Sequence, residues 1–414
     1  MRIAVLNWTR RRVAGAEAYL ASVIPALRGA GHAVVLVSEV DQPVVHEAIT
    51  LDGSGWCVSA MGRDRVFEEL RRWQPDVLYG NGLLSSSLEA TFLELAPAAF
   101  IAHGFYGTCI SGAKSFKAPL ARGCNRRFGW PCLLHYYPHR CGGLNPVTMV
   151  RDYRQQRTRL RLLRRYAAVV TYSRRMESEY LQHGIPREQL HRVQWCVEDR
   201  GERGLATVRS PDLHSDDRSH LVFLGRMESP KGGHLLIRAL PAVRAALGRD
   251  LRVTFGGDGS QRSTWEREAR RLRARHTGID ITFTGWLPLD ERDALLIESD
   301  LLVVPSVWPE PFGQVGIEAG RWGVPAAGFA VGGIPDWLES GVNGFLAPGD
   351  PPTPQGLAEA IFNCLRDADT LASLRRGAMK LAARWSVAAH LARLEPILAS
   401  IAQRRTAAVN EFPR

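Results

Sequence analysis

Two basic side chains, Arg226 and Lys231, follow an apolar run at 221–225 and precede a segment that has the apolar spacing of a helix. Cations that meet the first turn of a helix at the end of a strand suit a diphosphate, because the side chains and the free backbone N–H groups both attract phosphate oxygens. The chain has neither the Walker lysine pattern nor a G-x-G-x-x-G string, so a P-loop NTPase or a dehydrogenase is not supported. The competing interpretation is a solvated basic loop.

Two acids, Glu310 and Glu318, lie in a stretch that reads as strand, loop, helix, strand and Gly-rich turn between residues 300 and 350. This order is typical of a parallel α/β sheet. Ligands of such sheets bind at the carboxyl ends of the strands, so we expect both acids and the Gly332-Gly333 turn at the binding edge. Two acids eight positions apart also occur on solvated helix faces, and the spacing alone does not decide between the two interpretations.

The complete string around these acids is more specific. Residues 310–318 read E-P-F-G-Q-V-G-I-E and are followed by V-G-G-I-P at 331–335, which resembles the signature of the retaining glycosyltransferases of family 4, with the GT-B fold. The string G-R-x-x-x-x-K-G at 225–232 resembles a second signature of that family, and A-G-A-E at 14–17 resembles its first turn between strand and helix, usually G-G-A-E. The resemblance covers nearly the whole chain.

The resemblance implies an α/β fold in which two Rossmann-like, doubly wound domains face each other across a cleft. It also implies a donor site, carried over residue by residue. The matching nucleotide-sugar positions are Gly15, Arg226, Lys231, Trp286, Leu287, Glu310, Phe312, Gly313, Gln314, Val315 and Glu318. Glu310, Arg226 and Lys231, together with His103 at the end of an apolar run, are the catalytic positions that it implies, although a His at a strand end is otherwise often a polar edge residue.

The chemistry implied is a metal-independent transfer with retention at the anomeric carbon, without a catalytic cofactor. Arg226, Lys231 and backbone amides near 313–315 would neutralise the departing nucleoside diphosphate. Glu318 would accept hydrogen bonds from the ribose hydroxyls, and Glu310 would orient the sugar or stabilise its positive charge. His103 would contact the sugar from across the cleft. The co-substrate expected is a UDP- or GDP-linked sugar.

The helices and strands that position these residues are expected to form more than one hydrophobic core. A chain of 414 residues with 45% hydrophobic residues and a mean hydropathy of −0.15 is suited to two α/β domains. We predict an N-terminal acceptor-binding domain, an interdomain linker, a C-terminal nucleotide-sugar domain and a last helix that returns to the first domain. Their predicted bounds are 1–198, 199–219, 220–384 and 385–414. The family's usual N-G-V segment before the linker is here Trp195-Cys196-Val197.

Residues 105–165 form a basic insertion that is the least family-like part of the chain and our candidate acceptor platform. Four of the seven cysteines lie in it: Cys109, Cys124, Cys132 and Cys141. Clustered Cys and His residues suggest a structural zinc site, although no C-x-x-C pair is present. The alternative is free thiols in a core or a loop.

The positive charge is concentrated in the same region. Residues 101–175 hold fifteen Lys or Arg and one acid, Asp152, whereas the whole chain has a net charge of +11. A strongly basic helix is predicted at 149–166, and it suits either a solvated face or docking on an anionic lipid surface. The apolar runs are too short to span a bilayer and the N-terminus reads as a strand, so we expect a cytoplasmic protein, which contacts the inner face of the membrane if the basic helix docks there.

These observations predict transfer of a hexose-type sugar from the nucleotide sugar to a hydroxyl acceptor. The acceptor is either a small natural-product scaffold or a cell-envelope, lipid-linked glycan. The first alternative is an epimerase with the same fold that acts on a nucleotide sugar. The second is a non-catalytic nucleic-acid binder that uses the basic segment 101–175, but it would leave the donor residues unexplained, so we expect no nucleic-acid partner.

Overall fold

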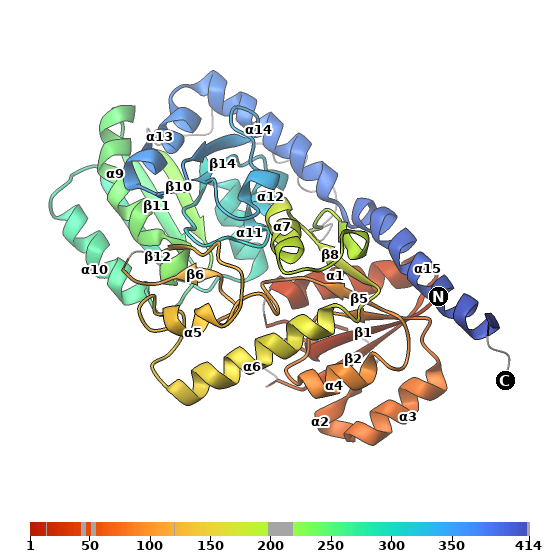
Figure 1. Cartoon of the computed structure of the whole chain (residues 1–414). Coiled ribbons are helices and arrows are strands. Elements are labelled where there is room, and N and C mark those ends of the chain that lie inside the picture. Colours follow the sequence, from red (N-terminus) through yellow and green to blue (C-terminus); the bar gives the residue numbers. More distant parts are fainter. Residues whose placement is uncertain (14, 43–46, 51–54, 120, 198–217, 412–414) are drawn as a thin grey trace.

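The computed structural model describes residues 1–13, 15–42, 47–50, 55–119, 121–197 and 218–411, with side chains described up to residue 403 (Figure 1). Its strands form two large sheets, one from each half of the chain, and a two-stranded antiparallel hairpin in the insertion. The predicted linker at 199–219 lies almost entirely outside the described residues.

The N-terminal sheet has seven strands in the order β3-β2-β1-β4-β5-β8-β9. All its described pairings are parallel, and its inner strands are buried along nearly their whole length because they carry runs of Val, Ile, Leu and Ala. The strands are β1 (Arg2–Thr9), β2 (Ala33–Val40), β3 (Trp56–Cys57), β4 (Val77–Gly80), β5 (Ala98–Ile101), β8 (Ala168–Thr171) and β9 (Leu190–Arg192).

The C-terminal sheet has six strands in the order β12-β11-β10-β13-β14-β15, again with parallel pairings. Both sheets are therefore of the doubly wound type that the sequence predicts, with crossover helices between parallel strands. The strands are β10 (Ser219–Leu224), β11 (Leu251–Gly256), β12 (Ile279–Gly285), β13 (Leu301–Val304), β14 (Ala326–Phe329) and β15 (Gly344–Ala347).

Helices cover the sheets, and the hairpin of β6 (Ser115–Phe116) and β7 (Arg122–Gly123) belongs to the insertion (Figure 1). The helices of the first half are α1 (Gly15–Gly29), α2 (Val58–Met61), α3 (Arg63–Trp73), α4 (Ser86–Phe92), α5 (Pro131–His135), α6 (Pro146–Leu163) and α7 (Arg174–Gln182). Those of the second half are α9 (Gly233–Leu247), α10 (Arg262–Arg273), α11 (Leu289–Ile297), α12 (Val315–Arg321), α13 (Pro354–Leu365), α14 (Ala368–Ala382) and α15 (Val387–Glu411). Short 3₁₀ turns lie at Arg187–Gln189, Ser229–Lys231, Ile334–Asp336 and Ala383–Trp385.

The basic helix α6 begins and ends three residues before the predicted range of 149–166. Its start is fixed by Asn145, whose side chain accepts a hydrogen bond from the Val147 N–H at 2.9 Å, and by Pro146 in the first helical position. Its end precedes Tyr166, which is fully buried against the N-terminal sheet. The sequence pattern located the helix, whereas its ends depend on capping and on burial.

Residues that follow strands of one sheet contact residues that follow strands of the other. Ser173, after β8, donates a hydrogen bond to the Pro311 carbonyl at 2.6 Å, and Arg174 forms an ion pair with Asp336 at 2.9 Å. The Trp195 ring stacks on Phe312, with 5.9 Å between centroids. The carboxyl edges of the two sheets therefore face each other, which is the arrangement of the GT-B fold.

The C-terminal helix α15 lies beside α1 (Figure 1). His390 on α15 donates from Nδ1 to the Gln194 carbonyl at 2.6 Å and accepts from the Tyr19 hydroxyl at Nε2 at 2.8 Å. Burial lowers the pKa of His390 to about 4, although the bond to Gln194 favours the protonated form. Two hydrogen bonds of this neutral, buried imidazole thus hold α15 against the N-terminal half.

This imidazole makes the stability depend on pH. Between about 4 and the usual value of 6.5, the unfolded chain binds a proton at His390 that the folded chain does not, so the free energy of unfolding falls as the pH is lowered through this window. In urea titrations we expect His390→Gln to remove up to about 3 kcal/mol of that pH dependence. His276→Gln, at an exposed histidine, serves as the control, and equal slopes for wild type and His390→Gln would contradict the assignment.

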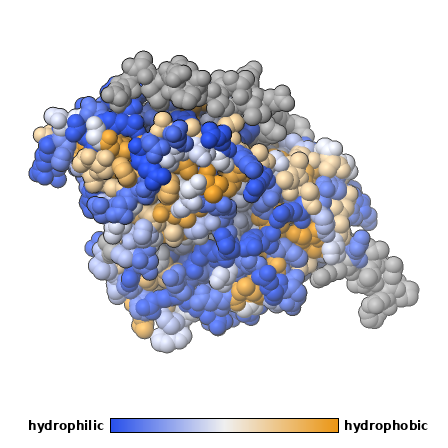
Figure 2. All heavy atoms as spheres, turned by 90° about the horizontal axis from the view of Figure 1, so that it is seen from above, coloured by the Kyte–Doolittle hydropathy of each residue, from blue (hydrophilic) through white to orange (hydrophobic). Residues whose placement is uncertain are grey.

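In the view of Figure 2, hydrophilic residues cover much of the visible face, and apolar residues show as separate areas between them. Within the described residues, none of the helices combines the length and the apolar character that crossing a bilayer demands.

Candidate active site

Glu310 and Lys231 lie together at the carboxyl ends of the neighbouring strands β10 and β13. Lys231 is in the turn after β10, and Glu310 is in the loop after β13, on the neighbouring strand of the sheet. Their charged groups form an ion pair at 2.5 Å, and Ser306 donates a hydrogen bond to the same Glu310 oxygen at 2.7 Å. The sequence had placed both residues at one binding edge but had not paired them.

The Glu310 carboxylate is kept ionised in a buried position. Burial by itself would raise its pKa, but the Lys231 ammonium and the hydrogen bonds from Lys231 and Ser306 outweigh it and hold the pKa below the usual value. The Glu310 side chain is 7% exposed, whereas that of Lys231 is 24% exposed. The arrangement therefore presents a fixed negative charge with a cation that solvent or a ligand can still reach.

The Gly332-Gly333 turn packs directly on the Glu310 backbone. The Gly333 N–H donates to the Glu310 carbonyl at 2.7 Å. Gly332 has φ +58°, and a Cβ there would lie 2.3 Å from the Glu310 nitrogen. Only glycine fits this close approach, so the turn holds the backbone of Glu310 in place.

Arg226 lies apart from the pair. It is exposed two residues after β10, and within the described part of the chain its guanidinium group makes no ion pair or hydrogen bond. Glu228, two residues along, is engaged with the Ser260 N–H and hydroxyl at 3.1 and 2.7 Å. Arg226 is thus a cation at the mouth of the site that is available to a ligand.

Glu318 and Gln314 lie on the first turn of α12. Glu318 pairs with Arg292 at 3.3 Å and accepts from the Gln314 amide at 3.2 Å. A Cβ on Gly15 would lie 3.3 Å from the Gln314 side-chain oxygen. The structure therefore brings Gly15, at the start of α1, against the donor half, whereas Ala14 of the same motif lies outside the described residues.

Phe312 has a structural position in the loop. Its ring is 3% exposed and packs against Trp195 and Trp385, with 4.8 Å between the Phe312 and Trp385 centroids. Its carbonyl accepts from the Trp337 indole N–H at 2.8 Å, beside Gly313. The Phe312 side chain thus anchors the loop that contains Gly313 and leads to Val315.

Trp286 and Leu287 follow β12 at the same edge of the sheet. Trp286 is 80% exposed, and Leu287 lies against Gly256, where a Cβ would come within 3.2 Å of a Leu287 methyl group. An exposed indole beside a glycine turn provides a flat apolar surface on which a base can stack.

His103, after β5, is held by Asn81, after β4. Its Nε2 lies 2.8 Å from the Asn81 amide oxygen, while the Asn81 amide nitrogen donates to the Leu6 and Tyr79 carbonyls. These bonds assign the proton of His103 to Nε2, so Nδ1, which is buried and has no hydrogen-bond partner, carries a free lone pair. Burial, assisted by His390, lowers the pKa of His103 to about 3, so the ring is neutral.

Aromatic contacts join His103 to the donor half. Phe105, two residues after His103, packs edge-on against Trp308 at 6.2 Å, and the Lys231 ammonium lies 5.5 Å from the centre of the Trp308 ring. Trp195 contacts both His103 and Phe312. Aromatic contacts therefore connect the segment that carries His103 with the loop that carries Glu310.

The insertion is anchored to α7 by a buried ion pair. Lys114 and Glu179 are 2.6 Å apart with side chains 1% and 0% exposed, and Arg175 adds a second contact to Glu179 at 3.2 Å. Lys114 also donates to the Thr108 carbonyl at 3.3 Å. The wall that carries Phe105 is thereby fixed to the N-terminal sheet.

The predicted zinc site at Cys109, Cys124, Cys132 and Cys141 stays a prediction. Among the described residues, no three Cys, His, Asp or Glu side chains are placed to hold a metal ion, and all seven cysteines are free. Cys132 and Cys141 pack against an apolar cluster of Ile110, Phe128 and Tyr136. Burial, and then the neighbouring thiols of the same group, raise the pKa of Cys124, Cys132 and Cys141.

Sequence reasoning missed Ser306, Asn81 and Arg292, each of which orients a predicted site residue. Asn81 had a detectable signal, because a polar residue directly after a buried strand lies at the binding edge. Ser306 had a similar one, two residues after β13. Arg292 had none, because its contact with Glu318 depends on how α11 packs beside α12.

Each half of the chain matches a known family of glycosyltransferase domains. Residues 14–194 match the family described as "Glycosyl transferase 4-like domain", and residues 218–367 match "Glycosyl transferases group 1". An uncharacterized glycosyltransferase of Methanocaldococcus jannaschii is 32% identical over 152 residues, 37% of each chain. The 2-deoxystreptamine glucosyltransferase of Streptomyces kanamyceticus is 36% identical over 166 residues, 40% of this chain and 41% of the relative. The chain thus matches less than half the length of each of these two curated relatives.

Solved structures resemble the chain over nearly its full length. The HepE protein of Anabaena in complex with UDP has a TM-score of 0.66 at 19% identity, covering 97% of this chain and 100% of that one. Sucrose-phosphate synthase from Thermosynechococcus elongatus has a TM-score of 0.64 at 16% identity, with both chains covered completely. At this identity the likeness establishes the fold.

Proposed function

We propose that this chain, which belongs to the GT-B glycosyltransferases through its 4-like and group 1 domains, transfers a hexose-type sugar from a UDP- or GDP-linked donor to a hydroxyl acceptor. The observation that carries the proposal is the Lys231–Glu310 pair, completed by Ser306 and the Gly332-Gly333 turn, with the exposed Arg226 side chain in the same loop as Lys231. UDP is the first donor nucleotide to test, because the HepE protein was crystallised with UDP and with UDP-glucose.

In this proposal the phosphates lie between Arg226, Lys231 and the backbone amides of 313–315. Negative charge that develops on the departing nucleoside diphosphate would be stabilised by these fixed donors. Glu318 would exchange its contacts with Arg292 and Gln314 for the ribose hydroxyls. The exposed Trp286 and the neighbouring Leu287 would face the base.

Glu310 and His103 would act on the sugar from opposite walls. The ionised Glu310 would orient the ring through a hydroxyl or stabilise the positive charge that develops at the anomeric carbon. The free Nδ1 lone pair of neutral His103 would accept a hydrogen bond from a sugar hydroxyl. Attack of the acceptor from the face that the diphosphate leaves would retain the anomeric configuration, and Arg226 and Lys231 would take the place of a divalent ion.

A turnover assay tests this proposal. UDP- and GDP-linked sugars are supplied with a mixed panel of hydroxyl acceptors and EDTA, release of nucleoside diphosphate is followed, and NMR reports the anomeric configuration of the product. We expect consumption of one donor, insensitivity to EDTA and retained configuration. Inverted product, or activity that EDTA abolishes, would refute the corresponding part of the mechanism.

We also propose that the enzyme docks on an anionic membrane surface through the insertion. Large apolar side chains are exposed there beside the basic face of α6: Trp130, Leu134, Tyr137, Leu144, Val147 and Val150. Leu144 and Val147 are 81% and 74% exposed. Exposed apolar groups flanked by arginines are the combination that enters the headgroup region of acidic bilayers.

Vesicle sedimentation checks this docking surface. We expect Leu144→Ser/Val147→Ser to reduce binding to phosphatidylglycerol vesicles about thirtyfold or more, since each of the two lost side chains removes burial worth about 1 kcal/mol or more. Val342→Ser, at an exposed valine in the other half, is the control. The proposal would be contradicted if both variants bound phosphatidylglycerol vesicles equally well. It would also be contradicted if the wild type bound phosphatidylcholine vesicles as tightly as phosphatidylglycerol vesicles.

A further inference from the structure

The indole of Trp308 lies beside both members of the Lys231–Glu310 ion pair. The Lys231 ammonium is 5.5 Å from the centre of its ring. The Glu310 N–H donates to the Trp308 carbonyl at 2.8 Å, so a tight turn joins these two residues. Burial raises the pKa of the Glu310 carboxyl, and the Trp308 indole is among the groups that, with Lys231 and Ser306, hold it below the usual value. The indole N–H therefore faces the Glu310 carboxylate.

This N–H is a hydrogen-bond donor that the structure leaves unused. Within the described residues, the Trp308 Nε1 atom is shielded from solvent and completes no hydrogen bond. Buried donors are normally satisfied, because a bond lost to water and not replaced costs free energy. Two other indoles of the chain follow that rule: Trp8 donates to the Glu17 carboxylate at 2.9 Å, and Trp337 donates to a backbone carbonyl at 2.8 Å. Trp308 is thus a free donor beside a buried carboxylate.

The surroundings of Trp308 hold its ring in this place. The N–H of the preceding residue, Val307, donates to the Pro230 carbonyl at 2.9 Å, which ties the loop to the turn that carries Lys231. On the side of the N-terminal half, Phe105 packs edge-on against the ring, with 6.2 Å between the centroids. The indole is therefore fixed, and a change at the ion pair decides whether its N–H bonds to the carboxylate.

Lys231 has two roles in the proposed function, and they compete. In the free chain Lys231 and Ser306 both donate to the same Glu310 oxygen, Oε1, at 2.5 and 2.7 Å. Lys231 is also proposed to hold the donor diphosphate, whose negative charge attracts the ammonium. As the ammonium turns toward the phosphates, the buried carboxylate loses part of the partner that offsets its burial. Another donor is needed at that moment.

We propose that Trp308 is the positioning residue that supplies this donor. Its indole N–H bonds to the Glu310 carboxylate once the diphosphate attracts Lys231, and together with Ser306 it holds the carboxylate in place beside the sugar. The inference rests on the proposed function, because a bound diphosphate is what draws the lysine away. Trp308 acts through Glu310 and not by touching the sugar.

NMR of the indole N–H groups tests this positioning without a ligand. The chain has 11 Trp residues, and the signal of Trp308 is the one that Trp308→Phe lacks. Lys231→Met imitates the withdrawal of the ammonium, so we expect the Trp308 proton signal to move downfield as the bond to the carboxylate forms. In Lys231→Met/Glu310→Gln the carboxylate is absent, and most of that shift should vanish.

Turnover tests the consequence for catalysis. Trp308→Phe keeps an aromatic ring next to Lys231 and Phe105 but removes the N–H. We expect kcat to fall about tenfold with little change in KM, because a bond to a charged group is lost in the transition state. In the Glu310→Gln background the same substitution should lower kcat about threefold or less, because the carboxylate that Trp308 positions is absent. Trp73→Phe, at a tryptophan that packs on Trp56, is the control expected to match the wild type.

The two arms separate this inference from the function on which it rests. An unmoved Trp308 signal in Lys231→Met would overturn the inference, whatever ligand the site binds. Wild-type turnover in Trp308→Phe would also overturn it, as would equal losses with and without the Glu310 carboxylate. A shifted signal in a chain that consumes no nucleotide sugar would refute the donor assignment alone. If Lys231→Met does not fold, the turnover comparison decides.

Discussion

Glu310→Gln is expected to lower kcat about 100-fold or more and to leave the fold intact. The substitution keeps the size of the side chain and its hydrogen bond with Ser306 but removes the negative charge that Lys231 and Ser306 hold ionised. If that charge acts on the developing cation of the sugar, its loss is felt in the transition state more than in substrate binding, so KM should change little.

The matched control is Glu339→Gln, at an acid outside the site. Donor turnover and thermal unfolding are measured for both variants. Unchanged turnover in Glu310→Gln would remove the role assigned to this residue, and a large rise in KM with unchanged kcat would reassign it to ground-state binding.

Lys231→Met is expected to affect stability and nucleotide binding together. It leaves the Glu310 carboxylate buried without its cation, which costs about 2–3 kcal/mol for a pair that is partly accessible. It also removes one of the two cations proposed to hold the diphosphate, so the Kd for the nucleotide should rise at least tenfold.

A double variant separates these two effects. In Lys231→Met/Glu310→Gln no unpaired charge remains, so most of the lost stability should return, while nucleotide binding stays weak. Urea titration and calorimetry give the two quantities. A double variant as unstable as Lys231→Met would show that the lysine stabilises the loop by packing on Trp308 and not by pairing with Glu310.

Much of the fold could be predicted because both sheets are built from short apolar runs, and such runs are visible in a sequence. The apolar runs at 301–304 and 324–329 contain β13 and β14, which are buried parallel neighbours in the sheet. Helix α6 was found but shifted, because Asn145 and Pro146 decide its start and they precede the apolar pattern.

The candidate site could be predicted as a set of positions but not as a set of contacts. Glu310 and Lys231 were both placed at one edge, yet their ion pair joins residues 79 positions apart and depends on the neighbouring order of β10 and β13. The bond from Asn81 to His103 depends in the same way on β4 lying beside β5.

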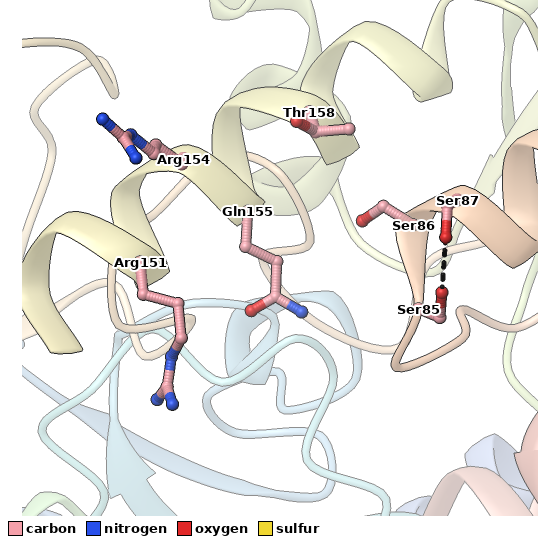
Figure 3. Close-up of a pocket in the computed structure, with 7 residues that line it drawn as sticks. All are labelled: Ser85, Ser86, Ser87, Arg151, Arg154, Gln155 and Thr158. Carbon is pink, nitrogen blue, oxygen red and sulfur yellow. Dashed lines mark hydrogen bonds between the residues drawn. The ribbon is translucent and has the colours of Figure 1, made fainter. Parts of the chain in front are cut away.

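The zinc prediction stays a prediction. Four thiols within 33 residues suggest ligands for a metal, and two of them, Cys132 and Cys141, also pack against a small apolar cluster beside α5 and α6. The arginines of α6 are visible in the sequence, yet nothing in the sequence shows that Arg151 and Arg154 lie near the serines at the start of α4 (Figure 3). That juxtaposition exists only in three dimensions.

Nucleotide binding tests the central claim most directly. The wild-type chain and Arg226→Gln/Lys231→Met are heated with UDP, GDP, dTDP or ADP, each with EDTA present. The account predicts that one nucleotide raises the Tm of the wild type by several degrees at saturating concentration, and that the double variant shows no rise. If the Tm does not rise with any nucleotide, or if the double variant responds as the wild type does, the site at Arg226, Lys231 and Glu310 is not a nucleotide-sugar site.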